Sequence, residues 1–169
     1  LFGLCLAHSS IAPRKNNRRR PKTDERVYLQ HADMLRFDEY GTNPGAQILN
    51  GHVSFLHKGA RLTCDSAYFY QETNSFKAFG HVKMRQGDTL SLASDYAWYD
   101  GDNEMAEARR NVVLKHRGTT LYTDSLNFDR LYNVAYFFEG GKMVDRKNVL
   151  VSDWGEYDTE TRKAVFNYN

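Results

Sequence analysis

The chain has few of the residues that mark several common protein classes. Its 169 residues include three prolines and two cysteines, Cys5 and Cys64. Two cysteines cannot build a disulfide framework or a zinc ligand set. No run of about 18 apolar residues follows the N-terminus, so the sequence predicts no membrane-spanning helix. No segment has a convincing helical period either, which leaves β-structure as the expected class.

An excess of positive charge is also missing outside one short stretch. The chain carries a net charge of +2, but residues 13–26 alone hold seven basic and two acidic residues, which leaves about −3 for the rest. A nucleic-acid-binding domain usually presents a basic surface. The composition therefore predicts that nucleic acid is not a partner.

The first 26 residues differ from the rest of the chain. Residues 1–12, LFGLCLAHSSIA, resemble the end of a truncated secretory leader, with a disordered remnant or a short anchor as alternatives. Residues 13–26 are almost without apolar side chains and are expected to form a flexible basic tether. A contact of this tether with phosphate groups or anionic lipid is the functional alternative. The folded domain is expected to span residues 27–169.

What the sequence does contain is a repeat. Aromatic residues make up 14% of the chain, which favours strands. A small residue followed by Asp recurs five times, with apolar or aromatic residues at the second and fourth positions after most of the aspartates. The aspartates lie 32, 30, 29 and 29 residues apart, at Asp33, Asp65, Asp95, Asp124 and Asp153. A period this regular indicates a repeat architecture.

Each unit predicts strands with one apolar and one polar face, separated by two turns. A leucine lies three residues before the aspartate in most units, for example Leu62 before Asp65. Since side chains alternate along a strand, this leucine and the apolar pair after the aspartate can share one core only if the strand bends or bulges at the small-Asp pair. The aspartate is expected to accept backbone N–H groups freed at that bend.

The junctions between units carry two further expectations. A glycine precedes the next unit at Gly51, Gly80 and Gly141, whereas Arg110 stands at the third junction. The arginine suggests that this turn does not require a positive φ. In the closing strand of the fourth unit, Val134, Tyr136 and Phe138 are expected to face the core.

The repeat length restricts the fold. A propeller blade needs about 40–45 residues and a hexapeptide β-helix coil far fewer, so a period near 30 fits neither. Two turns per unit suit a long antiparallel meander folded into two facing sheets.

The repeated words G-x-V, L-x-x-D and D-x-A-x-[FY]-D between Val27 and Asn169 resemble the OstA-like family of lipopolysaccharide-transport proteins. The resemblance implies an all-β fold: an elongated, V-shaped antiparallel β-jellyroll of units of about 30 residues, with acyl chains held between its sheets. It also implies non-enzymatic transport of lipopolysaccharide (lipid A) to the outer membrane. Expected partners are this glycolipid or a similar one, and other OstA-like domains or the outer-membrane translocon, bound by β-strand augmentation. The expected location is the periplasm, with outer-membrane association as an open alternative.

Apolar residues at equivalent repeat positions are the candidates to line a lipid groove, and ordinary core packing is the alternative for each. They are Val53, Phe55, Leu62, Phe69, Phe76, Val82, Met84, Leu92, Tyr99, Val112, Leu114, Leu121 and Phe128.

No motif predicts catalysis, a metal site or a cofactor. The five repeat aspartates could bind Ca²⁺ or perform acid–base chemistry. Each of them lies in the same short sequence motif, however, which is typical of a residue that maintains the fold. Cys64 stands where Ser or Thr stands in sister units, and the histidines lack metal-ligand spacing. Two other functions stay open: a structural module with a closed core, and a cell-surface carbohydrate-binding protein that uses Tyr68, Tyr96, Trp98 and Trp154 as stacking platforms.

Overall fold

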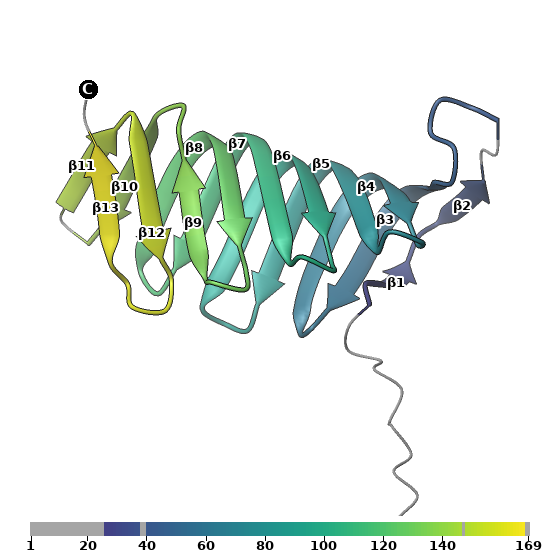
Figure 1. The fold of residues 1–169 in the computed structure, drawn as a ribbon, viewed down its shortest axis with the longest axis horizontal. Helices are drawn as coiled ribbons and strands as arrows, with labels where there is room; N and C mark the ends of the chain where they lie inside the picture. Colours follow the sequence, from purple (N-terminus) through teal and green to yellow (C-terminus); the bar gives the residue numbers. More distant parts are fainter. Residues whose placement is uncertain (1–25, 38–39, 147, 168–169) are drawn as a thin grey trace, which may run out of the picture.

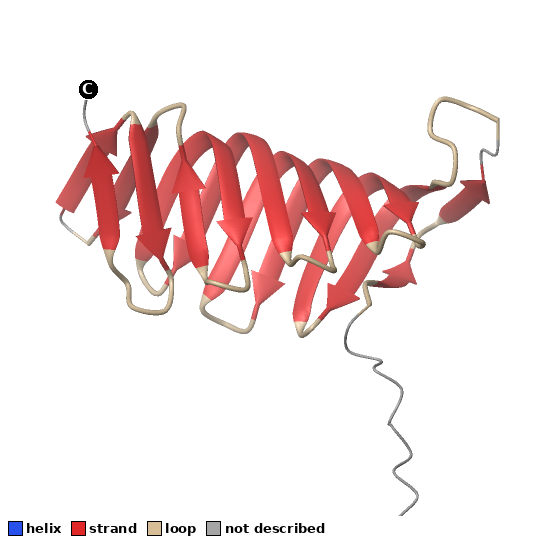
Figure 2. Cartoon of the chain, in the orientation of Figure 1, coloured by secondary structure: helices blue, strands red, loops and turns tan. Residues whose placement is uncertain are grey.

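The computed structural model describes residues 26–37, 40–146 and 148–167. The expected leader at 1–12 and nearly all of the basic tether at 13–26 lie outside these residues. Strands, turns and loops make up the described chain, without a helix (Figure 2). The strands are β1 (Tyr28–His31), β2 (Met34–Phe37), β3 (Gln47–His57), β4 (Ala60–Tyr70), β5 (Ser75–Gln86), β6 (Leu90–Asp100), β7 (Met105–His116), β8 (Thr119–Asp129), β9 (Val134–Phe137), β10 (Gly141–Asp145), β11 (Asn148–Ser152), β12 (Trp154–Asp158) and β13 (Ala164–Asn167).

Six long strands, β3 to β8, form an antiparallel meander that folds over itself into two layers (Figure 1). The pairing of each neighbouring pair breaks at the middle: in β3 and β4, Asn50 pairs with Ser66 and Val53 pairs with Cys64. Each long strand therefore has one half in each layer. Layer A contains residues 53–57, 60–64, 82–86, 90–94, 112–116 and 119–123 together with β1, β10 and β11. Layer B contains the other halves together with β2, β9, β12 and β13.

A two-residue bulge on β3, β5 and β7 turns the chain from one layer to the other. The bulge residues Gly51-His52 and Gly80-His81 have φ angles of 76° and 45°, and of 73° and 44°. In each case the register sets two bulge residues against one aspartate of the next strand. A Cβ atom on Gly80 would collide with the Asp65 carboxylate, so glycine is required by space as well as by φ.

The expectation for Arg110 was wrong. Arg110 and Asn111 form the bulge of β7 with φ angles of 62° and 52°, although neither is glycine. The bulge geometry at the corner is therefore retained although the glycine of the repeat motif is replaced. A non-glycine residue in this conformation costs about 1–2 kcal/mol, which the two flanking strand pairs must offset.

All five repeat aspartates lie at the corner between the layers, on β4, β6 and β8 and at the β1–β2 and β11–β12 junctions. His52 and His81 contact the carboxylates of Asp33 and Asp65, both at 2.7 Å. The backbone N–H of Asn111 donates to Asp124 Oδ1 at 3.1 Å, and its side-chain amide donates to Asp95 Oδ2 at 2.8 Å. The repeated aspartate therefore fastens the bulge of the neighbouring strand.

The predicted change of parity at the small-Asp pair is confirmed. In β4, Leu62 and Cys64 are buried before Asp65, and Ala67 and Phe69 are buried after it. The bulge itself lies on the adjacent strands. The strand that carries Asp65, β4, bends at the corner, and its neighbours β3 and β5 contain the extra residues.

Two clusters of buried side chains fill the space between the layers, one built on Val27 and β3 to β6 and one on β6 to β10 and β12. Met84 and Ala106 pack against both. The expectation for β9 was wrong by one residue: Ala135 and Phe137 are buried, whereas Phe138 is exposed. The register of β9 is shifted by one residue from the expected one, because Ala135, and not Val134, pairs with the inward-facing Phe128. The fold confirms an elongated, all-antiparallel β-jellyroll.

Candidate functional site

The space between the two layers, called the slot below, is lined by equivalent positions of successive strands. All thirteen predicted groove residues face it: twelve are buried and Met84 is half-buried. Small residues form the row nearest the corner in layer B, at Ala67, Ala78, Ala97 and Ala108, which pair with one another across β4 to β7. The next row toward the turns carries the aromatic residues Phe69, Phe76, Tyr99 and Phe128, with Ala106 between Tyr99 and Phe128.

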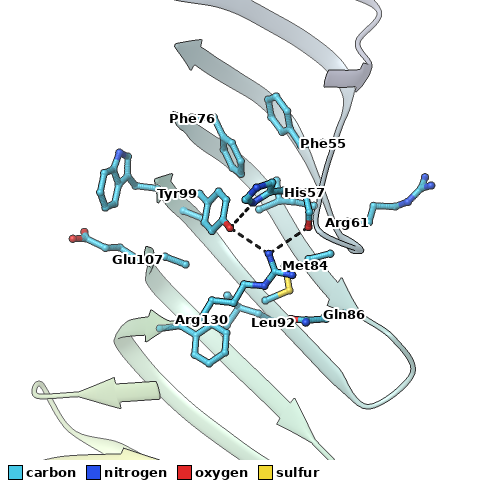
Figure 3. A pocket seen from close by; sticks show the side chains of 16 residues that line it. Phe55, His57, Arg61, Phe76, Met84, Gln86, Leu92, Tyr99, Glu107 and Arg130 are labelled. Atoms are coloured by element: carbon cyan, nitrogen blue, oxygen red, sulfur yellow. Dashed lines mark hydrogen bonds between the residues drawn. The ribbon is translucent and has the colours of Figure 1, made fainter. Parts of the chain in front are cut away.

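A pocket opens in the slot where the two buried clusters meet (Figure 3). Phe55, Phe76, Met84, Leu92 and Tyr99 line it, and Phe55 stacks on Phe76 from the opposite layer with ring centroids 4.3 Å apart. The cavity volume is about 50 Å³, room for roughly three to five water molecules. The layers are therefore in contact, and the slot is narrow.

Three charged residues lie in the turns beside this pocket, and together they are called the latch: Lys58, Glu104 and Arg130. Of the three, Arg130 lines the pocket. Lys58 lies in the β3–β4 turn of layer A, whereas Glu104 and Arg130 lie in turns of layer B. Lys58 Nζ forms an ion pair with Glu104, and Arg130 Nη1 lies 3.8 Å from Glu104 Oε2. Arg130 Nη2 also donates to the Lys58 carbonyl at 2.7 Å. The latch thus ties the two rows of turns together.

A buried polar pair lies directly inside the latch. His57 Nδ1 and Tyr99 Oη are 2.8 Å apart, and Arg130 Nη1 donates to the same hydroxyl at 3.4 Å (Figure 3). Burial raises the pKa of Tyr99, so its hydroxyl stays protonated. Burial by itself would raise the pKa of Glu104, but the hydrogen bond from Lys58 and the charges of Lys58 and Arg130 outweigh it and lower that pKa. The carboxylate is therefore held in its charged form.

The other residues considered for chemistry do not form a catalytic arrangement. Within residues 26–37, 40–146 and 148–167, no group of three or more His, Cys, Asp or Glu side chains is placed to hold a metal ion. Burial raises the pKa of the Cys64 thiol to about 12, and its Sγ donates to the Ser66 carbonyl at 3.2 Å. A thiol with that pKa is protonated and a poor nucleophile.

The aromatic side chains proposed as sugar platforms lie on the outer face. Trp154 is exposed, whereas Tyr68, Tyr96 and Trp98 are half-buried. Phe79 packs between Tyr68 and Tyr96, with centroid distances of 5.2 and 5.5 Å and interplanar angles of 68° and 54°. These tilted cross-strand pairs stabilise the sheet and offer no row of parallel ring faces.

Exposed apolar side chains mark both ends of the meander. They are Met34, Leu35 and Phe37 on β2, Val149, Leu150 and Val151 on β11, and Val165 on β13. β11 pairs with β10 alone and β13 with β12 alone among the described strands. Such strand edges are templates for pairing with another chain.

The latch residues were not predicted from the sequence as site residues. Lys58 and Arg130 lie in turns, where Lys and Arg are ordinary, so their residue types alone do not mark a site. The signal available was a break in the repeat, since Arg130 follows Asp129 at the place where Gly101 follows Asp100. In a repeat protein, a charged residue at a position that is uncharged in the other repeats is a candidate functional residue.

The described part of the chain contains no helix that is long and apolar enough to cross a membrane.

The fold and the slot define a class: a two-layer antiparallel β-jellyroll with an apolar interior and free strand edges. The sequence profile of the family described as OstA-like protein matches residues 24–169, so the chain belongs to the OstA-like family. A search of curated proteins gives no sequence match.

One solved structure supports the same fold. It is LptH from Pseudomonas aeruginosa, titled the LptA-homologous periplasmic component of the conserved lipopolysaccharide transport device. The two structures superpose with a TM-score of 0.54 at 16% sequence identity, over 78% of this chain and 86% of that chain. At this identity the likeness shows the fold.

Proposed function

We propose that the chain is a non-enzymatic carrier in the periplasm, which holds the acyl chains of lipopolysaccharide (lipid A) or a similar glycolipid in the slot. The observation that carries the proposal is the apolar interior between two layers that are covalently continuous only at the corner. At the edge of the turns, the described hydrogen bonds that join the layers all involve side chains, as in His57 with Tyr99. Membership of the OstA-like family and the fold shared with LptH support this function.

The energetics favour binding by burial. Each methylene removed from water contributes about 0.8 kcal/mol, so a dodecyl chain supplies up to about 10 kcal/mol before any cost is subtracted. The main cost follows from the cavity volume of about 50 Å³, which is too small for such a chain. The layers must therefore part at the turns, and the binding free energy is what remains after the contacts between them are lost.

A photo-crosslinking amino acid placed in the slot tests this function. At Phe76, which is buried, we expect crosslinks to purified lipopolysaccharide, and at Phe138, which is exposed on the outer face, we expect none. Substitution of Leu114 by Asp places a charge in the slot and should abolish the Phe76 crosslink while the β-sheet circular dichroism spectrum is retained. Equal crosslinking at both positions, or none at either, contradicts the proposal.

We further infer that residues 27–169 act as one unit that stacks end to end through its edge strands. The support is the exposed apolar side chains on β2 at one end and on β11 and β13 at the other. Other OstA-like domains or the outer-membrane translocon are the partners that such edges would pair with. Val151→Lys on β11 should prevent concentration-dependent assembly in light scattering, whereas Lys115→Gln on the outer face of β7 should not.

A second function, a structural module with a permanently closed core, is favoured by the narrowness of the slot. The two functions differ in hydrogen exchange. For a carrier, the exchange rates of the backbone amides in the β3–β4 and β8–β9 turns should change when lipopolysaccharide is added, because the layers part there. A closed module shows the same exchange with and without the lipid.

A further inference from the structure

The latch breaks the symmetry of the repeat at one copy. Equivalent turn positions of layer B can be identified by a shared backbone hydrogen bond, in which Gly101, Arg130 and Thr159 donate to the carbonyls of Asn74, Glu104 and Asn133 at 2.9, 3.0 and 2.9 Å. Glu104 therefore stands where asparagine stands in the sister turns. Arg130 stands where glycine and threonine stand, so the ion pair is not needed to build the turn.

The charged copy reaches the pocket through Arg130, and it carries excess positive charge. Lys58 and Arg130 face a single carboxylate, that of Glu104. The side chain of Arg130 is only 9% exposed. Its guanidinium is oriented by the carbonyls of His57 and Lys58 and by the Tyr99 hydroxyl. The arginine head group and the apolar wall of the slot thus lie within one site (Figure 3).

Glu104 occupies the position of an anion in this site. An ammonium has three N–H groups and a guanidinium has five. The contact with Glu104 uses one donor of Lys58, and Arg130 Nη1 lies 3.8 Å from the same carboxylate. A phosphate monoester presents three oxygens and up to two negative charges, so it accepts charge-assisted hydrogen bonds from both cations with one more oxygen than a carboxylate.

We propose that Lys58 and Arg130 form a phosphate-recognition site at the mouth of the slot, and that the phosphate of an incoming amphiphile displaces Glu104. The proposal rests on the carrier function above and names the chemical class of its ligand: an amphiphile with a phosphate group close to its acyl chains. Displacement of Glu104 breaks the ion pair between Lys58 of layer A and Glu104 of layer B. Recognition of the phosphate and parting of the layers are then one event.

Calorimetric titration of the whole chain with two amphiphiles of equal chain length tests the proposal, below their micellar concentrations. Dodecyl phosphate should bind about tenfold more tightly than uncharged dodecyl maltoside, as expected for charge-assisted contacts in a partly buried site. Lys58→Gln should reduce that ratio severalfold. Glu104→Gln should increase it, because the competing carboxylate is gone. Lys115→Gln removes an exposed lysine of layer A and should leave the ratio unchanged.

The outcomes separate this inference from the carrier function. If both amphiphiles bind with equal affinity, or if the variants change both affinities alike, the phosphate site is overturned and the carrier function stands. If neither amphiphile binds, the carrier function falls as well. Inorganic phosphate is the third probe: we expect no measurable binding, and binding as tight as that of dodecyl phosphate overturns the assignment to an amphiphile.

Discussion

The two halves of the molecule contain the same cross-layer pair in different surroundings. His57 and Tyr99 lie 2.8 Å apart in the first half, and His116 and Tyr157 lie 3.0 Å apart in the second. Both ring pairs are edge-on, with the same interplanar angle of 63°. The latch and the pocket accompany the first pair, whereas Thr159 takes the place of Arg130 near the second. The repeat therefore supplies the same frame in both halves, and the departures from it make the surroundings of the two pairs differ.

In the second half, one aromatic side chain occupies a row that is filled by small residues in earlier units. The register places Phe137 in the row nearest the corner, where Ala78 and Ala108 stand in earlier units. Its ring lies against Gly155 and Gly141: a Cβ atom on Gly155 would lie 2.6 Å from Phe137 Cζ. Phe137 is 1% exposed. The slot is thus narrowed at its C-terminal end by a residue that needs two glycines to fit.

Truncation of the two buried phenylalanines should give the largest effects. Phe55→Ala and Phe137→Ala should each lower the free energy of unfolding by about 3–5 kcal/mol, because each leaves a cavity in a packed interior. Urea denaturation measures both. The halves should differ in ligand binding, since only Phe55 lines the pocket. Phe138→Ala on the outer face is the control, with an expected change within about 0.5 kcal/mol. A similarly small loss for Phe137→Ala would show that this end is not tightly filled.

Removal of the hydrogen bonds at the turns should give a smaller difference between the halves. Arg130→Gln should cost about 1.5–3 kcal/mol, because a charged donor to buried oxygens is lost. Thr159→Val at the equivalent turn removes one neutral hydrogen bond, from Thr159 Oγ1 to the Asn133 carbonyl at 3.0 Å, and should cost about 0.5–1.5 kcal/mol. Chemical denaturation of both variants makes the comparison. Equal costs would mean that the latch does not hold the layers together.

Much of this architecture could be predicted from the sequence because it repeats. The spacing of the aspartates predicted five equivalent corners, and the parity of Leu62 and Phe69 around Asp65 predicted the bend. The same argument predicted which side chains face the slot. These features depend on alternation along a strand and on recurrence, both of which are local and visible in one chain.

What the sequence did not predict depends on register and on contacts between distant turns. Phe137 and not Phe138 is buried because the pairing of β8 with β9 sets the register, and single-residue shifts are invisible in an apolar run such as Tyr136-Phe137-Phe138. Arg130 lies 72 residues from Lys58, so no local pattern relates the two. Arg110 keeps a positive φ because the register on both sides requires the bulge, whatever residue occupies it.

The corner bulges offer a third comparison between the halves. Gly80→Ala in the first half should lower the free energy of unfolding by about 1–2 kcal/mol or more, because alanine is unfavourable at φ of 73° and its Cβ meets Asp65. Arg110→Gly in the second half should raise it by about 0.5–1 kcal/mol, because relief of about 1–2 kcal/mol of strain at φ of 62° outweighs the greater entropy of glycine in the unfolded chain. Thermal unfolding of the two variants tests the opposite signs. A destabilised Arg110→Gly variant would show that the arginine side chain contributes more than its strain costs.

The smallest expected effect is in the pH dependence of stability, and it has opposite signs at two histidines. Burial, with the nearby charges of Arg117 and Arg162, lowers the pKa of His116 below its ordinary value of 6.5. The unfolded chain then binds the proton more readily, so the stability that neutral His116 contributes is complete above pH 6.5 and decreases as the pH falls below it. At His52 the hydrogen bond to Asp33 raises the pKa. Its contribution is therefore complete below pH 6.5 and lost as the pH rises through the raised value.

Thermal unfolding between pH 5 and 8 measures both contributions. Glutamine is the natural substitute for His116, since Gln86 stands at the equivalent position of the preceding unit. We expect His116→Gln to lose less of its melting temperature than the unmodified chain on acidification, and His52→Gln to lose more, each by about 2 °C or less. Lys115→Gln, which changes an exposed side chain on the outer face of β7, is the control. A parallel pH profile for all variants would mean that folding does not change the proton affinity of His116. The two His–Tyr pairs would then differ only in the charged residues beside them.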